Sequence, residues 1–177
     1  MRLSRAAVAG LAAVMLLVQA AVQLAVGRPS ICTCGYVALW HGPVDAGNSQ
    51  HLLDWYSLSH VVHGLILFAL AWVLLRGQPV RVRFLTALAV EAGWEVLENT
   101  PFVIDRYRMT ATALGYVGDS VVNSLGDVAS MSLGFLVAAR LPAWVGVALA
   151  VALEAVAYLA IRDNLILNII ALAATFR

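Results

Sequence analysis

Charged residues are scarce in this chain of 177 residues, and lysine is absent from it. Charged side chains make up 12% of the residues, whereas a soluble domain carries about 25%. All 11 basic residues are arginines, the formal net charge is +1, and no block of basic residues occurs. The chain therefore has no surface that would follow a nucleic-acid backbone, and we expect no nucleic-acid partner.

Cysteine is also scarce, because the chain has only Cys32 and Cys34. Two cysteines cannot build the set of several disulfides that holds small secreted domains together. A Cys-x-Cys pair is a poor candidate for a disulfide. We interpret the pair as two loop cysteines that neither join nor bind metal. The alternative is a copper or zinc site formed with His41 and His51.

Hydrophobic residues are in excess, at 62% of the chain, and the mean hydropathy is +0.88. A soluble domain is about 45–50% apolar. Runs of about 20 apolar residues are long enough to cross a bilayer as helices. We therefore predict an all-α fold, a polytopic transmembrane helical bundle of about five to six membrane helices. The expected spans are 6–26, 57–75, 84–98, 119–139 and 143–161, followed by the short stretch 165–176.

No linker or repeat divides the chain, so we expect residues 1–177 to form a single membrane domain. Its first segment is interpreted as an uncleaved signal anchor, with a cleavable signal peptide as the alternative. The expected parts are the signal anchor 6–26, a periplasmic loop 27–56, a helical core 57–164 around a polar cavity, and a short C-terminal apolar segment 165–177.

The arginines predict the orientation. With a cytoplasmic N-terminus, six arginines lie inside and four outside, and the segment Arg76–Arg83 is the densest basic loop, without an acidic residue. Basic loops favour the cytoplasmic side of a membrane. We therefore expect the N-terminus and this loop in the cytoplasm.

Polar residues gather at the outer ends of three spans, in 54–63, 91–99 and 119–127. The inner halves of the same spans are almost purely apolar. An ionisable residue at membrane depth costs about 2.5–3.5 kcal/mol on insertion scales. Such residues persist where they pair, bind a metal or line a hydrated cavity.

Helical spacing brings these residues onto shared faces. Glu91, Glu95 and Glu98 follow an i, i+4, i+7 pattern, and His60 and His63 are three residues apart. The residues Asp119, Asn123 and Asp127 follow an i, i+4, i+8 pattern. We expect these faces to meet in one cavity that opens outward.

Imidazole and carboxylate groups are ordinary ligands of zinc, iron and manganese, and metal sites in bundles use side chains of facing helices. A spare carboxylate or imidazole could act as a general base. A cavity without metal and purely structural pairing are the alternatives. The candidate metal ligands are His60, His63, Glu91, Glu95, Asp119 and Asp127. The candidate catalytic residues are His63, Glu95, Glu98 and Asp119. The candidate substrate-binding residues are Asp54, Asn99, Arg106, Arg108 and Asn123.

Several strings of residues carry a resemblance to a known family. They are Cys34-Gly-Tyr, Leu39-Trp-His-Gly, Asn48-Ser-Gln-His-Leu, Asp54-Trp-Tyr-Ser, Trp94-Glu-Val-Leu-Glu-Asn, Tyr116-Val-Gly-Asp-Ser-Val-Val-Asn-Ser and Ile161-Arg-Asp-Asn-Leu. Over about residues 30–170 the chain resembles an uncharacterised family of multi-pass inner-membrane proteins found mainly in alphaproteobacteria. This is domain of unknown function 2585, or uncharacterised protein family 0314. The resemblance implies a location in the bacterial inner membrane.

A more remote likeness concerns the order of polar residues. The chain has histidine in one expected helix, glutamate in the next, and then Asp and Asn before a helix that contains glycine. This order is similar to the order in VanZ-like membrane proteins. Those proteins tend to open with Asp-Lys-x-x-His, where this chain has Ser-Leu-Ser-His60.

Two hypotheses follow for the function. The first is a metal-assisted or acid–base hydrolase or transferase that acts on a membrane lipid or a lipid-linked envelope molecule. The second is a non-catalytic protein of the VanZ-like kind that binds lipid or protects the envelope. A transporter is disfavoured, because the second and third spans have apolar cytoplasmic halves.

Overall fold

Every regular element in the described part of the chain is a helix. The computed structural model describes residues 3–110 and 116–176, which form seven helices and no strand. The helices are α1 (Arg5–Ala25), α2 (Tyr56–Leu74), α3 (Val80–Glu98), α4 (Pro101–Arg108), α5 (Val121–Ala138), α6 (Ala143–Ile161) and α7 (Leu165–Ala174). The predicted all-α fold is confirmed.

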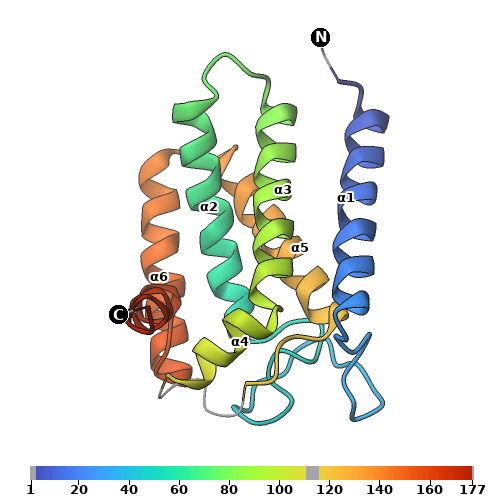
Figure 1. Ribbon diagram of the computed structural model, residues 1–177. Coiled ribbons are helices and arrows are strands. Elements are labelled where there is room, and N and C mark those ends of the chain that lie inside the picture. Colours follow the sequence, from blue (N-terminus) through green and yellow to red (C-terminus); the bar gives the residue numbers. More distant parts are fainter. Residues whose placement is uncertain (1–2, 111–115, 177) are drawn as a thin grey trace.

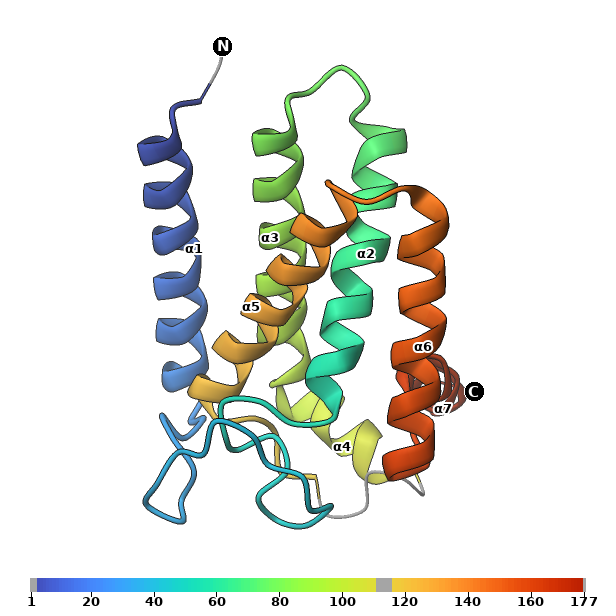
Figure 2. The ribbon, with the colours of Figure 1, turned by 180° about the vertical axis from the view of Figure 1, so that it is seen from behind.

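Four helices are long and apolar enough to cross a membrane: α1, α2, α5 and α6. α3 is equally long but carries three glutamates, and it lies between α1 and α2 (Figure 1). α1, α2, α3 and α6 run nearly parallel, whereas α5 crosses them obliquely, as the reverse view shows (Figure 2). This arrangement is a helical membrane bundle.

The helix bounds agree with the expected spans except at two starts. α3 begins at Val80 rather than Phe84, because Pro79 stands at its N-cap with a φ of −59°, which suits a helix start. α5 begins after Ser120, whose hydroxyl accepts the Asn123 N–H at 3.2 Å. Asp119 therefore precedes the helix, and its expected place on one helical face with Asp127 is wrong.

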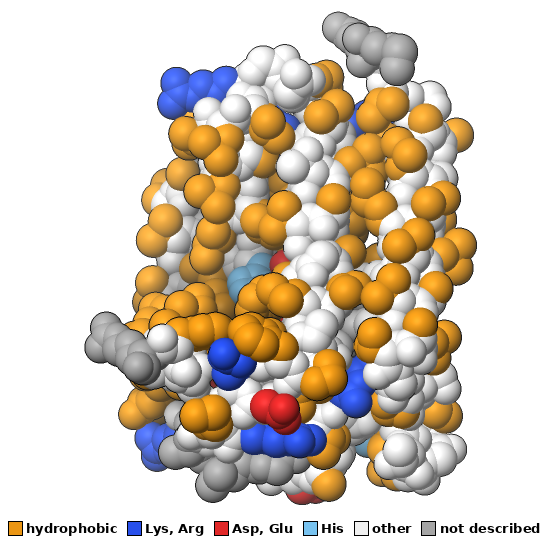
Figure 3. All heavy atoms as spheres, in the orientation of Figure 1, with side chains coloured by type: hydrophobic (Ala, Val, Ile, Leu, Met, Phe, Trp, Pro, Cys, Tyr) orange, Lys and Arg blue, Asp and Glu red, His pale blue; other side chains and the backbone are white. Residues whose placement is uncertain are grey.

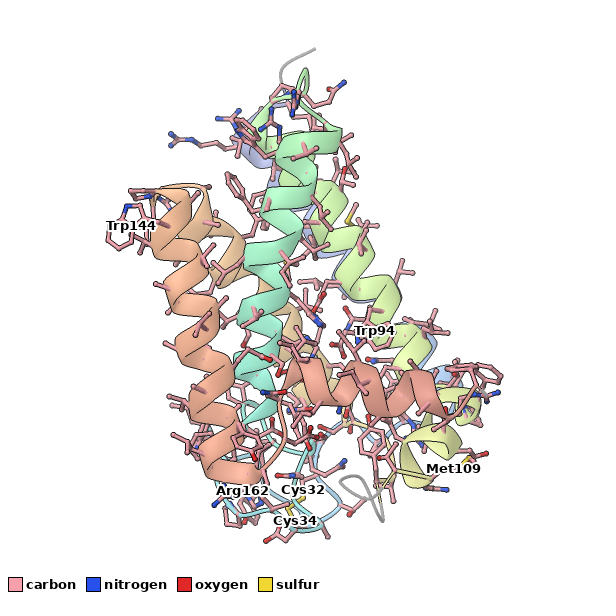
Figure 4. All side chains as sticks on the ribbon, turned by 90° about the vertical axis from the view of Figure 1, so that its left-hand side faces the viewer. Cys32, Cys34, Trp94, Met109, Trp144 and Arg162 are labelled. Carbon is pink, nitrogen blue, oxygen red and sulfur yellow. A yellow bond between two sulfur atoms is a disulfide. The ribbon has the colours of Figure 1, made fainter. Side chains whose placement is uncertain are left out.

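The last helix, α7, lies across the bundle rather than along it (Figure 4). Its ten residues make a helix of about 15 Å, which is half the thickness of a hydrocarbon core. The Glu154 carboxylate of α6 accepts the N–H groups of Leu165 and Ile166 at 3.3 and 3.2 Å. This carboxylate thus holds the start of α7 against α6, where a helix N-terminus favours negative charge.

α2 and α5 pack backbone against backbone. A Cβ added at Gly134 of α5 would lie 2.1 Å from the carbonyl oxygen of Val61 in α2. A Cβ added at Gly64 of α2 would lie 2.0 Å from the carbonyl oxygen of Met131 in α5. Small residues permit such close approach between membrane helices. The contact brings the polar face of α5 up to the histidines of α2.

The segment between α1 and α2 folds over the ends of the helices that lie opposite the start of α1, which we call the outer end of the bundle (Figure 1). The N–H groups of Ser120 and Val121 donate to the carbonyl oxygens of Ser49 and Pro29 at 2.9 and 2.8 Å. The Asn123 amide donates to the carbonyl oxygen of His51 at 2.8 Å. The N-terminus of α5 is therefore covered by this segment, which we call the outer loop (residues 26–55).

Cys32 and Cys34 form a disulfide, so the expectation that they remain unbonded is wrong. The segment is a turn and not an extended strand. The Gly35 N–H donates to the Cys32 carbonyl oxygen at 3.0 Å, and Gly35 has a φ of 87°, a conformation that glycine adopts without strain. The turn places the two cysteine Cα atoms 5.1 Å apart, within the range that a disulfide requires.

We predict that Gly134→Ala lowers the thermal stability of the protein. The added methyl group forces α2 and α5 apart, and overpacking of this kind costs about 1–3 kcal/mol. The control is Gly146→Ala in α6, whose added Cβ meets no atom within 4 Å. The measurement is thermal unfolding in detergent. Equal melting temperatures for the two variants would contradict the assigned contact.

Candidate functional site

One carboxylate oxygen joins two histidines between α2 and α3. The Glu91 Oε1 atom lies 2.6 Å from Nδ1 of His60 and 3.1 Å from Nδ1 of His63. Glu91 is 2% exposed, because α3 packs directly on α2 at this level. The i, i+3 spacing of the histidines places both rings over the same carboxylate, as the sequence predicts.

Glu95, one turn along α3, is the most unusual group in the site. Its side chain is fully buried, and neither carboxylate oxygen has a hydrogen-bond partner among the described residues. Its nearest titratable neighbour is His60, with Nδ1 3.5 Å from Oε1. Burial of a charged carboxylate without a partner costs several kcal/mol, which sets Glu95 apart from the hydrogen-bonded Glu91 and Asp127.

Asp127 of α5 borders the same histidine from the opposite side. Its Oδ2 atom lies 3.9 Å from Nε2 of His60, and its Oδ1 atom accepts the Ser57 hydroxyl at 2.8 Å. Asp127 is 3% exposed. The structure thus brings together His60, His63, Glu91, Glu95 and Asp127 from the predicted set, from three helices.

Two groups within this cluster could hold a cation. Among the described residues, His60, His63 and Glu91 each offer one ligand atom, all within 4.8 Å of one another, and the same holds for His60, Glu95 and Glu98. Two ligands of one zinc ion, at about 2.0–2.2 Å from it, lie at most about 4.4 Å apart, so small side-chain movements suffice. The group of His60, Glu95 and Glu98 includes Glu95, whose carboxylate oxygens have no hydrogen-bond partner among the described residues. In the group of His60, His63 and Glu91, both histidines already hydrogen-bond to Glu91.

Asp119 belongs to a neighbouring network toward the outer end. Its Oδ2 atom accepts the Asn99 amide and its Oδ1 atom accepts the Tyr116 hydroxyl, both at 2.7 Å. Its own N–H donates to the Asn99 oxygen at 2.7 Å. Burial raises the pKa of the Asp119 carboxyl, and these two side-chain donors oppose that shift. Neither candidate cation group includes Asp119, so its ligand and catalytic roles stay predictions.

Two other predicted substrate residues hold the outer loop in place. Asp54 is 1% exposed, and its carboxylate accepts the N–H groups of Ser49 and Tyr56 at 2.7 and 2.8 Å. Burial raises the pKa of Asp54, and these backbone donors oppose the shift. Asn123 is equally buried and donates to the outer loop at His51.

The predicted head-group arginines both lie in the last turn of α4. Arg106 stacks its guanidinium 3.6 Å from the Phe102 ring centroid and 4.5 Å from that of Phe176. Arg108 donates to the Tyr116 carbonyl oxygen at 2.6 Å and pairs with Asp105 at 3.4 Å. Arg108 remains half-exposed, whereas Arg106 joins α4 to the chain that follows α7.

The comparisons with known proteins identify a family for this chain. Residues 23–177 match the model of a family described as protein of unknown function, DUF2585. The chain belongs to this family. The resemblance predicted from the motifs is therefore confirmed, while the VanZ-like likeness stays a prediction.

Relatives of this DUF2585 chain share close to half of its residues. A UPF0314 protein of Agrobacterium fabrum is 50% identical, over 92% of this chain and 83% of the relative. A UPF0314 protein of Sphingopyxis alaskensis is 45% identical, over 92% and 87%. One from Paracoccus denitrificans is 46% identical, over 83% and 77%. No solved structure matches the chain.

The DUF2585 chain also contains site residues that the sequence reasoning missed. Gln23 of α1 donates to the Ser124 hydroxyl at 2.7 Å and to the Glu95 carbonyl oxygen at 3.3 Å. Gln19, one turn earlier, is 2% exposed, and neither of its side-chain polar atoms has a partner among the described residues. The signal was present, because an i, i+4 pair of glutamines interrupts an otherwise apolar helix.

The DUF2585 site opens sideways and not toward the outer end. The outer loop and residues 116–120 cover its outer end, which corrects the expected outward opening. In Figure 3 imidazole atoms and an acidic oxygen are visible between α2 and α3, above α7, with hydrophobic side chains around them. His63 has 21% of its side chain exposed, against 9% for His60. The opening therefore faces the apolar flank of the bundle.

We expect Asn99→Ala to destabilise the DUF2585 fold through this outer network. The change removes donors to Asp119, to the Glu95 carbonyl oxygen and to Ser124. Unsatisfied buried polar groups cost about 1–3 kcal/mol each, so the melting temperature in detergent should fall by several degrees. Thr86→Ala, an exposed threonine of the same helix, is the control. A melting temperature unchanged from that of the control would exclude a structural role for Asn99.

Proposed function

We propose that this protein is an inner-membrane hydrolase or transferase that uses a divalent metal ion, zinc, iron or manganese, on a membrane lipid or a lipid-linked envelope molecule. The observation that carries the proposal is Glu95, a fully buried carboxylate with two unpartnered oxygens beside a histidine. A cation supplies what this group lacks.

The ligands of the proposed ion are His60, Glu95 and Glu98. They come from two adjacent helices, and their ligand atoms already lie within 4.8 Å of one another. Glu91 accepts from the His60 ring and so orients it from behind, as carboxylates do for metal-bound histidines. Nε2 of the ring is then the atom left for the ion, and the Asp127 carboxylate lies 3.9 Å from it on the side of α5.

His63 is the residue placed for proton transfer. Its Nδ1 atom faces the Glu91 carboxylate, which fixes the ring and leaves Nε2 for a reacting group. Its partial exposure puts it at the opening, whereas His60 lies behind it. A metal ion in the proposed position would activate a water molecule, and His63 would take or return the proton.

The direction of the opening supports a lipid substrate. A water-soluble substrate would need a path from the outer end, which the outer loop covers. A lipid reaches the gap between α2 and α3 from within the bilayer, with its chains against the apolar flank seen in Figure 3. The predicted partners, a membrane lipid or a lipid-linked envelope molecule, fit this approach.

The orientation in the membrane follows from the ends of the helices. The N-terminus and the turn between α2 and α3 lie at one end of the bundle, and the outer loop lies at the other (Figure 1). The first end carries Arg76, Arg81 and Arg83 and favours the cytoplasm. The metal centre then lies in the periplasmic half of the bilayer.

We expect the purified protein to contain about one equivalent of metal. Glu95→Gln should lose at least ten-fold in metal content, because it removes a charged ligand but keeps the shape of the side chain. Asp105→Asn changes an exposed carboxylate on α4 and is the control. The measurement is elemental analysis of protein in detergent, together with its melting temperature.

Two results would overturn the metal proposal. One is wild-type protein without stoichiometric metal after growth with each of the three metals. The other is a Glu95→Gln variant that keeps its metal. Metal-free protein with a markedly lower melting temperature for Glu95→Gln would instead favour a structural role for the cluster.

We expect a cysteine introduced at Gly77 to be reached only from the cytoplasmic side. Gly77 is exposed in the turn between α2 and α3, and a Cβ there meets no atom within 4 Å. A membrane-impermeant maleimide added to intact cells should label Ala46→Cys in the outer loop but not Gly77→Cys. Labelling of Gly77→Cys from outside would reverse the orientation.

A further inference from the structure

The Cys32–Cys34 disulfide does not hold distant parts of the fold together. It closes a ring of neighbouring residues, so it restricts the unfolded chain much less than a disulfide over a long loop. The outer loop is fastened by other means, through backbone hydrogen bonds from Ser120, Val121 and Val122 to residues of the loop. The disulfide is therefore free to open without release of the loop.

The two sulfur atoms differ in their surroundings. Cys34 is exposed to solvent, whereas Cys32 is 5% exposed. The Cys34 N–H group points at the Cys32 sulfur, at 3.1 Å. A hydrogen bond from a backbone N–H stabilises a thiolate more than a thiol. Cys34 is thus the sulfur that a reductant reaches, and Cys32 is the better leaving group.

His51 lies beside the two sulfur atoms. One of its ring nitrogens lies within 4.8 Å of ligand positions on both cysteines. Its Nδ1 atom accepts the Ala38 N–H at 3.1 Å, so the neutral ring carries its proton on Nε2. Burial lowers the pKa of His51 and so favours its neutral ring.

We propose that Cys32 and Cys34 form a thiol–disulfide exchange site that accepts two electrons from a dithiol. A thiolate of the dithiol attacks the Cys34 sulfur, the bond between Cys34 and Cys32 breaks, and Cys32 leaves as a thiolate. The second thiolate of the dithiol then attacks the dithiol sulfur that is bonded to Cys34, the bond between that sulfur and Cys34 breaks, and Cys34 leaves as a thiolate. The dithiol ends as a disulfide, and its two protons end on Cys32 and Cys34.

The first test is reduction of the folded protein. Millimolar dithiothreitol should reduce the pair in detergent without denaturant, as read by the mass shift after maleimide labelling. The melting temperature should change by only a few degrees, because the disulfide is not a staple of the fold. A pair that resists reduction until denaturant is added, or a large loss of thermal stability on reduction, would overturn the proposal.

The second test separates the two sulfurs. In Cys32→Ser, the remaining Cys34 should react with glutathione disulfide at least ten-fold faster than the remaining Cys32 does in Cys34→Ser. The pH dependence of alkylation in Cys34→Ser should give a thiol pKa below about 8.5, the ordinary value of cysteine. Equal rates for the two cysteines, or an ordinary pKa for Cys32, would contradict the assigned roles.

Discussion

The contact between the backbones of α2 and α5 governs the geometry of the whole site. Gly64 and Gly134 let the two helices approach until carbonyl oxygens occupy the space of missing side chains. This approach sets Asp127 beside His60 and Ser57. The same contact turns the apolar face of α5, with Met131 and Phe135, into the core. The apolar core and the polar cluster therefore both depend on this one contact between α2 and α5.

The hydrogen bonding of the buried polar residues becomes less complete with depth in the bundle. Toward the outer end, Asp119, Asn99 and Tyr116 satisfy one another and support the covering loop. Deeper in the bundle the pairing becomes incomplete and ends at Glu95. Structural hydrogen bonds between membrane helices return only about 0.6 kcal/mol each on average. Stability therefore does not explain the unpartnered carboxylate of Glu95, and we place the function there.

Local sequence signals predicted most of the helices and the meeting of His60, His63 and Glu91. Apolar runs and i, i+3 or i, i+4 spacing are properties of one segment, so they predict its helix without knowledge of the rest of the fold. The same signals missed α4, although Thr100 followed by Pro101 is typical of a helix start. They could not show the cover of the outer loop, because it depends on bonds such as Ser120 to Ser49, between residues about 70 positions apart. Asp119 was misplaced for a local reason, since Ser120 caps the helix after it.

The position of α5 in the chain has a consequence for the order of assembly. Chains fold from the N-terminus as they are synthesised, and the pair α2 and α3 already carries both histidines and all three glutamates. The outer loop can close only after residues 118–124 have emerged, because its anchors are the backbone and side chains of that segment. During biosynthesis the hairpin of α2 and α3 therefore passes through an uncovered stage, in which the proposed cation would reach its ligands from the aqueous side before α5 docks.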